Sequence, residues 1–190
     1  MNNDFSSMAQ LMLPAVDDEM RAILGFDGSP PEPFLGMMHY QMGWVDEALQ
    51  PIAPKSGKRI RPLVCLLAND AAGGDWRQAV PAAAAIEIIH NFSLIHDDIE
   101  DASPTRRGRP TVWKVWGEAQ AINSGDAMFT LAHSAMSRLM ETGIPPATVV
   151  RALQRFDETC FHLTEGQFAD MDFETRDEVT VDEYILSLIH

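Results

Sequence analysis

Apolar residues recur at helical spacing along almost the whole chain, and no segment shows the sustained alternation of a half-buried strand. Glycine and proline clusters divide this pattern, because both residue types interrupt helices. The chain is therefore predicted to be all-α. The expected helices cover about residues 5–24, 34–50, 56–73, 81–101, 111–122, 124–142, 146–174 and 181–190, with a loop at 103–110.

The size and composition are those of a folded protein. With 190 residues the chain can form one domain with a substantial core, and 46% hydrophobic and 22% charged residues argue against disorder. No stretch approaches the roughly 20 uninterrupted apolar residues of a membrane-spanning helix, and the first residues lack the features of a signal peptide. We therefore expect a cytoplasmic protein without a transmembrane segment.

Charge is distributed unevenly along this acidic chain. The formal net charge of -14 argues against nucleic acid or anionic lipid as a partner. Eight of the 14 lysine and arginine residues nevertheless fall in two short segments: Lys55, Lys58, Arg59 and Arg61, and then Arg106, Arg107, Arg109 and Lys114. This clustering indicates local anion-binding sites.

The most specific polar segment is Asp97-Asp98-Ile99-Glu100-Asp101, at the end of a predicted helix. Asp97 and Asp101 are one helical turn apart, and His90 lies upstream on the same face. Two carboxylates at this spacing suit Mg²⁺, which prefers oxygen ligands and completes its shell with water and phosphate oxygens. A solvated acidic helix end is the alternative. The arginine pair that follows favours a phosphorylated substrate, because arginine binds phosphate in a bidentate fork.

Residues 97–108 resemble the first aspartate-rich motif of the trans-isoprenyl diphosphate synthases, in which two aspartates, two spacers and a third aspartate precede an arginine pair and a glycine. Gly57-Lys58-Arg59-Ile60-Arg61-Pro62 is similar to the family's glycine-lysine-x-x-arginine segment. His90 falls where the family has a substrate-binding histidine or glutamine. Gly166-Gln167 with Asp170 resembles its later glycine-glutamine motif. The four matches occur in the family's order.

The resemblance implies an isoprenoid synthase fold, a bundle of long, mostly antiparallel helices around a central substrate cavity. It also implies a homodimer that uses Mg²⁺ to condense an allylic diphosphate with isopentenyl diphosphate, giving a longer trans-polyprenyl diphosphate such as geranylgeranyl or farnesyl diphosphate. The catalytic residues would be Asp97, Asp98, Asp101 and Arg106, with Asp97 and Asp101 as Mg²⁺ ligands and Arg106 on the allylic diphosphate. The remaining substrate-binding residues would be Lys58, Arg61, His90 and Arg107 on isopentenyl diphosphate, and Gln167 and Asp170 opposite the metal.

Product length depends, by analogy with the family, on the residue five positions before the first aspartate. Phe92 occupies this position and the smaller Ser93 follows it, a pattern that resembles geranylgeranyl-forming members more than farnesyl-forming members. On an ideal helix Phe92 points about 140° away from Asp97, so helix geometry alone does not give it this role.

The last part of the sequence departs from the family pattern. The second aspartate-rich motif and a lysine-threonine pair of the family are absent, and Asp170 and Asp172 lack the turn-long spacing of that motif. The predicted helix at 181–190 carries no C-terminal cap signal. We therefore expect a single all-α prenyltransferase domain over residues 1–190 that is incomplete at its C-terminus.

Three alternatives stay open. A non-catalytic or complementing subunit would pair with another chain that supplies the second motif. A terpene cyclase would share the metal and diphosphate chemistry but would not need the basic groups around Lys58 and Arg61. A purely structural helical protein would need none of these site residues.

Overall fold

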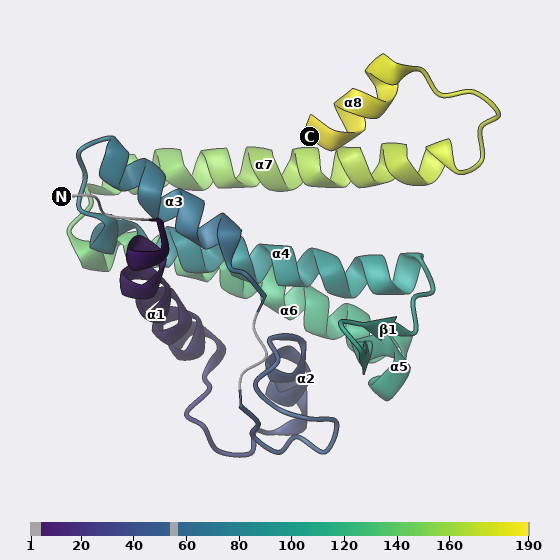
Figure 1. Ribbon diagram of the computed structural model, residues 1–190, viewed down its shortest axis with the longest axis horizontal. Helices are drawn as coiled ribbons and strands as arrows, with labels where there is room; N and C mark the ends of the chain where they lie inside the picture. The colour runs from purple at the N-terminus through teal and green to yellow at the C-terminus, as the bar shows by residue number, and fades with distance from the viewer. Residues whose placement is uncertain (1–4, 54–56, 190) are drawn as a thin grey trace. The chain divides into compact units, whose positions relative to one another are not determined.

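The computed structural model describes residues 5–53 and 57–189, and it confirms the prediction of an all-α protein. Two compact units divide between Ile144 and Pro145. The first contains α1 (Phe5–Leu24), α2 (Pro33–Gln41), α3 (Ile60–Ala71), the 3-10 turn η1 (Trp76–Ala79), α4 (Val80–Glu100), β1 (Thr105–Arg106), β2 (Arg109–Pro110), α5 (Val112–Trp116), α6 (Glu118–Ser137) and η2 (Arg138–Thr142) (Figure 1). The second contains α7 (Pro146–Phe173) and α8 (Val181–Ile189).

Helix α4 is the central element of the first unit. It packs against α1, α3 and α6, and Ala84 and Ile88 on it are fully buried. Gly125 lets α6 approach α4 closely, because a Cβ atom at this position would overlap the imidazole of His96. By length and composition Trp76–Glu100 is apolar enough to cross a membrane. This is weak evidence for a span, because a buried core helix such as α4 passes the same test.

The predicted helix over 34–50 is wrong beyond Gln41, where α2 ends. Gly43 adopts a left-handed φ of 77°, which stops the helix, and the chain then folds back into an isolated bridge between Val45 and Pro51. Trp44 is buried in this turn and stacks on a phenylalanine ring. The apolar spacing of the segment therefore reflects the packing of an irregular turn.

Two other predicted boundaries are displaced. Helix α3 begins at Ile60, because Arg59 has a left-handed φ of 50° that an α-helix does not accommodate. The predicted helix start at Ser56, and the clustered Lys55, lie outside the described residues. The predicted break near residue 123 lies instead at Gly117, whose φ of 85° separates α5 from α6.

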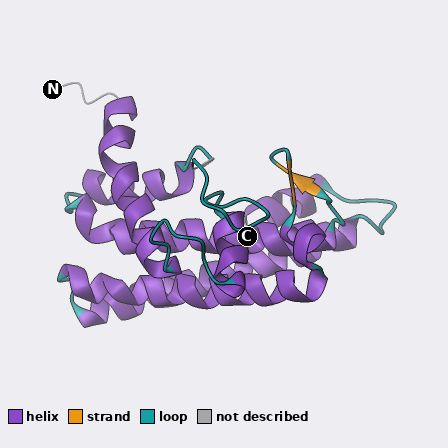
Figure 2. Ribbon diagram, turned by 90° about the horizontal axis from the view of Figure 1, so that it is seen from below, coloured by secondary structure: helices purple, strands orange, loops and turns teal. Residues whose placement is uncertain are grey.

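The predicted loop at 103–110 contains a short antiparallel hairpin, drawn as the only orange strands among the described residues in Figure 2. Arg106 pairs with Arg109, and the two residues between them are Arg107 with φ 53° and Gly108 with φ 76°. Two-residue hairpins favour turns with positive φ at both central positions, and glycine adopts this conformation without strain. The arginine-arginine-glycine motif is thus a tight turn.

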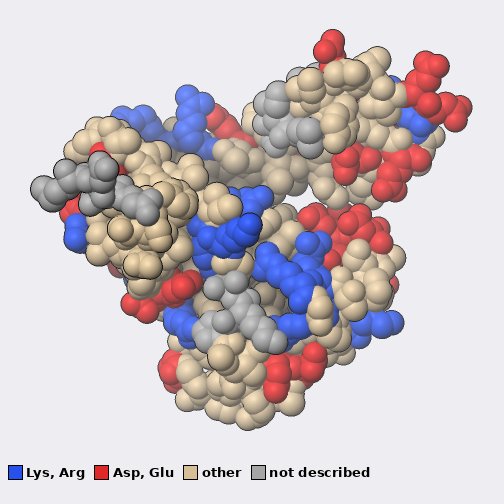
Figure 3. Space-filling view, in the orientation of Figure 1, with Lys and Arg blue, Asp and Glu red and all other residues tan. Residues whose placement is uncertain are grey.

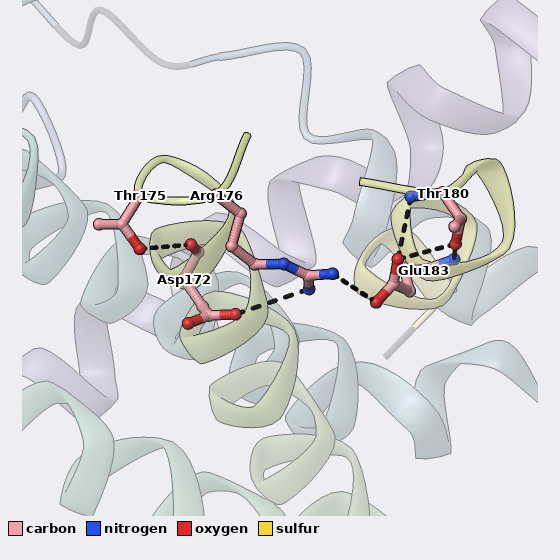
Figure 4. A network of polar contacts seen from close by, with 5 residues as sticks. All are labelled: Asp172, Thr175, Arg176, Thr180 and Glu183. Atoms are coloured by element: carbon pink, nitrogen blue, oxygen red, sulfur yellow. Dashed lines mark hydrogen bonds and ion pairs between the residues drawn. The ribbon is translucent and has the colours of Figure 1, made fainter. Parts of the chain in front are cut away.

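The second unit is built from the two helices expected at 146–174 and 181–190. A polar network holds the turn between them (Figure 4). The Glu183 carboxylate accepts hydrogen bonds from the amide and hydroxyl of Thr180, which forms a capping box at the start of α8. Arg176 donates to Glu183 and forms an ion pair with Asp172. The bonds from Thr180 and Arg176 lower the pKa of Glu183 to about 2.

Candidate active site

The aspartate-rich segment forms the last turn of α4 and its C-terminal cap. Asp97 lies on the helix and Asp101 caps it, with the Asp101 amide donating to the Asp97 carbonyl at 2.9 Å. Burial, and then the charge of Glu100, raise the pKa of Asp97 to about 6, against the lowering effect of Arg106. Asp101 and Asp98 raise it further. Repulsion within this group of carboxylates is what a bound cation would relieve.

Asp98 forms the buried part of this site. Its side chain is 2% exposed, and Oδ1 accepts a hydrogen bond of 2.7 Å from Nε of Arg106. The second oxygen, Oδ2, is buried and has no hydrogen-bond partner among the described residues. Burial raises the pKa of Asp98, and the bond from Arg106 lowers it. Because this bond uses Nε, the two terminal amino groups of Arg106 stay outside it.

Asp97 and Asp101 are the candidate metal ligands of this site. No group of three or more His, Cys, Asp or Glu side chains within residues 5–53 and 57–189 is arranged to hold an ion. Asp97 and Asp101 offer hard oxygen ligands from one turn of helix, and this fits a cation that keeps several waters and binds phosphate oxygens, as Mg²⁺ does. The residues therefore fit Mg²⁺ only if substrate, water or other groups complete its shell.

The glycine-lysine segment meets the hairpin in the first unit. A Cβ atom on Gly57 would lie 3.4 Å from both terminal nitrogens of Arg107, so the two motifs lie side by side. Lys58 beside it is exposed, as is Arg61 in the first turn of α3. Two motifs that lie about fifty residues apart in the sequence thus share one surface.

His90 lies within the same group of cations. Burial, and then the positive charges of Arg61, Arg107 and Arg106, lower its pKa below the usual 6.5, while Glu87 opposes them. The imidazole is therefore neutral at neutral pH and can donate one hydrogen bond to an anion. Figure 3 shows Lys and Arg side chains gathered between the start of α3 and the hairpin.

A small cleft of about 60 Å³ adjoins these residues. It is lined by Tyr40, Gln41, Asp98, Arg106, Arg107, Arg109, Pro110 and Thr111. Sequence reasoning missed Tyr40 and Gln41, because nothing in the pattern of α2 distinguishes them from other core positions. Their place follows from the fold, in which the Tyr40 hydroxyl donates to the Pro110 carbonyl at 2.7 Å.

Arg109 has a structural role in this cleft. Its Nη2 donates to the Val45 carbonyl at 2.7 Å, and its guanidinium lies 3.9 Å from the centre of the Tyr40 ring. These contacts tie the hairpin to the turn after α2. Arg109 therefore belongs to the basic cluster in the sequence but is already engaged by the protein.

The two candidate chain-length residues are half-buried on α4. The Phe92 ring packs edge-on against His96 and against Phe129 of α6, at centroid distances of 4.7 and 5.2 Å. Ser93 is half-buried and donates from its hydroxyl to the His90 carbonyl. Their role in product length stays a prediction.

Gln167 and Asp170 lie on α7, in the second unit. Gly166 is buried, Gln167 is half-buried and Asp170 is exposed. Their predicted position opposite the carboxylates of α4 concerns two separate units and stays a prediction.

Comparison with known proteins identifies the family of the chain. The family model described as polyprenyl synthetase matches residues 42–189. The chain is 44% identical over 147 residues to the (2E,6E)-farnesyl diphosphate synthase of Mycobacterium tuberculosis H37Rv, covering 77% of this chain and 40% of that protein. It is 46% identical over 129 residues to the geranylgeranyl diphosphate synthase of Methanosarcina mazei, covering 68% and 39%.

Solved structures give the same result. The crystal structure of a polyprenyl synthetase from Streptomyces coelicolor A3(2) superimposes with a TM-score of 0.85 at 34% identity, covering 97% of this chain and 52% of that one. The geranylgeranyl pyrophosphate synthetase of Geoglobus acetivorans gives 0.81 at 34% identity, covering 95% and 54%. The chain spans about two fifths to one half of the length of these relatives. Its sequence and its helical fold together establish that it belongs to the polyprenyl synthetase family.

Proposed function

We propose that this chain is a Mg²⁺-dependent prenyltransferase that condenses an allylic diphosphate with isopentenyl diphosphate. The observation that carries the proposal is the meeting of two motifs in the first unit. The charges of Arg61, Arg107 and Arg106 add to burial in lowering the pKa of His90, and the carboxylates of Asp97 and Asp101 lie at the end of the same helix. Such a site can hold two diphosphates, one beside a metal and one among cations.

The proposed reaction breaks the allylic carbon-oxygen bond, and the diphosphate leaves with the electron pair. The double bond of isopentenyl diphosphate then attacks the allylic carbocation, a carbon-carbon bond forms, and a proton is lost. When bound, Mg²⁺ would neutralise charge on the departing diphosphate. The residues of this chain bind and orient, and no side chain acts as a nucleophile.

Each charged residue has a proposed task. Asp97 and Asp101 hold the metal, Asp98 orients Arg106, and the terminal amino groups of Arg106 contact the allylic diphosphate. The diphosphate of isopentenyl diphosphate is bound by Lys58, Arg61, His90 and Arg107, and Gln167 and Asp170 complete the allylic side. Phe92 and Ser93 limit the length of the product, and we propose a geranylgeranyl or farnesyl product, the products for which the relatives in Methanosarcina mazei and Mycobacterium tuberculosis are named.

The proposal extends to the setting of the protein. We infer that it works in the cytoplasm as a homodimer, with small diphosphates and not nucleic acid as partners, in keeping with its net charge of -14. A second candidate function is a complementing or non-catalytic subunit. The observation that favours it is the incomplete donor set, two carboxylates without a third ligand among the described residues.

A product assay separates these functions. The purified chain is incubated with Mg²⁺, labelled isopentenyl diphosphate and dimethylallyl, geranyl or farnesyl diphosphate, and the dephosphorylated prenols are separated by chromatography. Elongated prenol that is absent in Asp97→Ala would establish the synthase and give its product length. Metal-dependent binding of geranyl diphosphate without product would favour the complementing subunit. A folded chain that binds no diphosphate would exclude both.

A further inference from the structure

Arg59 behaves differently from its basic neighbours. Lys58 and Arg61 are exposed, whereas Arg59 is 7% exposed, although all three belong to one cationic motif. Its backbone has a left-handed φ of 50°, an unfavourable conformation for a residue other than glycine. A buried cation on a strained backbone persists only where the surrounding structure holds it.

Two carboxylates hold the Arg59 guanidinium. Nη1 donates to Oε1 of Glu87 on α4 at 2.7 Å, and Nε lies 3.5 Å from Oδ1 of Asp17 on α1. Glu87 is itself buried, with 6% of its surface exposed. The three residues therefore join α1, α4 and the segment before α3. We call them the Arg59 anchor.

The anchor lies directly behind the diphosphate-binding surface. Glu87 and His90 are three residues apart on α4, so the turn of helix that binds Arg59 also carries the imidazole. In the sequence, Arg59 lies between Lys58 and Arg61. Gly57, two residues before it, faces the guanidinium of Arg107, which would lie 3.4 Å from a Cβ atom at this position. Movement of residue 59 would therefore displace Lys58 and Arg61 relative to His90 and Arg107.

We propose that Arg59 is a positioning residue for diphosphate binding. It does not contact the diphosphate; the Arg59 anchor sets the positions of Lys58 and Arg61 relative to His90 and Arg107. This inference rests on the proposed function, because it presupposes that these four residues bind a diphosphate. It assigns different tasks to two arginines of one motif: Arg61 binds, and Arg59 orients.

The test is calorimetric titration of the folded chain with isopentenyl diphosphate without Mg²⁺, and separately with geranyl diphosphate and Mg²⁺. Arg59→Met should weaken the first affinity about tenfold and change the second less than about twofold. Arg59→Lys keeps a positive charge beside Glu87 but lacks the guanidinium that also faces Asp17. It should therefore recover part of the lost affinity. In the double variant Arg59→Met and Arg61→Met, the loss of binding free energy should be smaller than the sum of the losses in the two single variants, because Arg59 acts through Arg61.

A matched control distinguishes positioning from general stability. Arg138 forms an ion pair of similar length with Glu19, at 2.6 Å, which joins η2 to α1. Arg138→Met should lower stability without changing either affinity. If it weakens isopentenyl diphosphate binding as much as Arg59→Met does, the positioning role is excluded. Should Arg59→Met not fold, Glu87→Gln and Asp17→Asn test the same anchor with smaller changes.

The remaining outcomes are also decisive. Unchanged binding in a folded Arg59→Met, Glu87→Gln or Asp17→Asn variant would overturn the inference and leave the proposed function intact. An unmodified chain that binds neither diphosphate would overturn the proposed function, and the role of Arg59 with it.

Discussion

The two basic segments of this protein contain similar residues in opposite arrangements. Arg59 and Arg107 both have a left-handed backbone, with φ of 50° and 53°. Arg59 is buried between two carboxylates, whereas Arg107 is exposed at the tip of a hairpin turn. In the hairpin it is Arg106, the residue before Arg107, that forms an ion pair, with Asp98. Each segment thus has at least one arginine that the protein holds and another that is exposed.

The comparison teaches that positive charge alone does not identify a ligand-binding residue. Arg59 and Arg106 differ from the exposed arginines because each has a carboxylate partner in the core. These partners, Glu87 and Asp98, are each less than about a tenth exposed. Loss of one partner of a buried ion pair leaves an uncompensated charge, which destabilises a protein by about 3–5 kcal/mol. Loss of an exposed cation changes stability by at most about 0.5 kcal/mol. Arg59 should therefore govern stability, the exposed Arg61 and Arg107 should govern binding, and the partly exposed Arg106 should contribute to both.

The largest effect is expected for Glu87→Ala, which leaves the Arg59 guanidinium buried with only the more distant Asp17. We expect the free energy of unfolding to fall by about 3–5 kcal/mol. Urea unfolding followed by tryptophan fluorescence measures it, because all four tryptophans, at positions 44, 76, 113 and 116, lie in the first unit. Arg61→Met is the control, with a change within about 0.5 kcal/mol. Equal losses in the two variants would contradict the comparison.

A smaller loss is expected for Asp98→Ala. The Arg106 side chain is 33% exposed, whereas that of Arg59 is 5% exposed, so water can solvate Arg106 when its partner is removed. We expect a loss of about 1–3 kcal/mol in the same unfolding experiment. A larger loss than for Glu87→Ala would show that burial of the arginine does not control the strength of these pairs.

Arg107→Asn should separate stability from binding. Asparagine before glycine favours the turn with positive φ at both central residues, so the variant should be more stable by up to about 1 kcal/mol. It should also bind isopentenyl diphosphate about tenfold more weakly, because one exposed guanidinium is lost. Unfolding and calorimetry on the same sample give both values. Reduced stability would indicate that Arg107 makes structural contacts that outweigh its backbone strain.

The smallest effect concerns the pKa of His90, measured by NMR titration of the imidazole. After burial, Arg61 is the largest influence that lowers this pKa, so Arg61→Met should raise it. Lys114→Met is the matched control, because Lys114 belongs to the other basic cluster and is not among the groups that shift His90. No change in Arg61→Met would mean that this guanidinium lies too far from the imidazole to share a ligand with it.

The lowered pKa of His90 also has a consequence for stability. Below about pH 6.5 the unfolded chain takes up a proton that the folded imidazole resists, so the unfolded state binds more protons. The contribution of His90 is complete above pH 6.5 and is lost as the pH falls towards the lower pKa of the folded protein. Substitution by glutamine should remove this part of the pH dependence, which is read from the difference between the two unfolding curves.

Local patterns in the sequence determined much of the fold. The boundaries of α1, α4 and α7 agree with the expected helices to within about a residue, because helical periodicity and flanking glycine or proline are local signals. The place of Asp97 and Asp101 on one turn follows from the same periodicity. Order and spacing of the motifs were enough to predict the family, which the matched relatives confirm.

Only the tertiary structure divided the basic residues into paired and exposed ones. Arg59 meets a partner 28 residues away on α4, and Arg109 bonds a carbonyl 64 residues away. The same holds for Tyr40 and Gln41, which reach the cleft because α2 packs beside the hairpin. A pattern read over one or two helical turns carries no information about such partners, because burial and ion pairing depend on which elements the fold brings together.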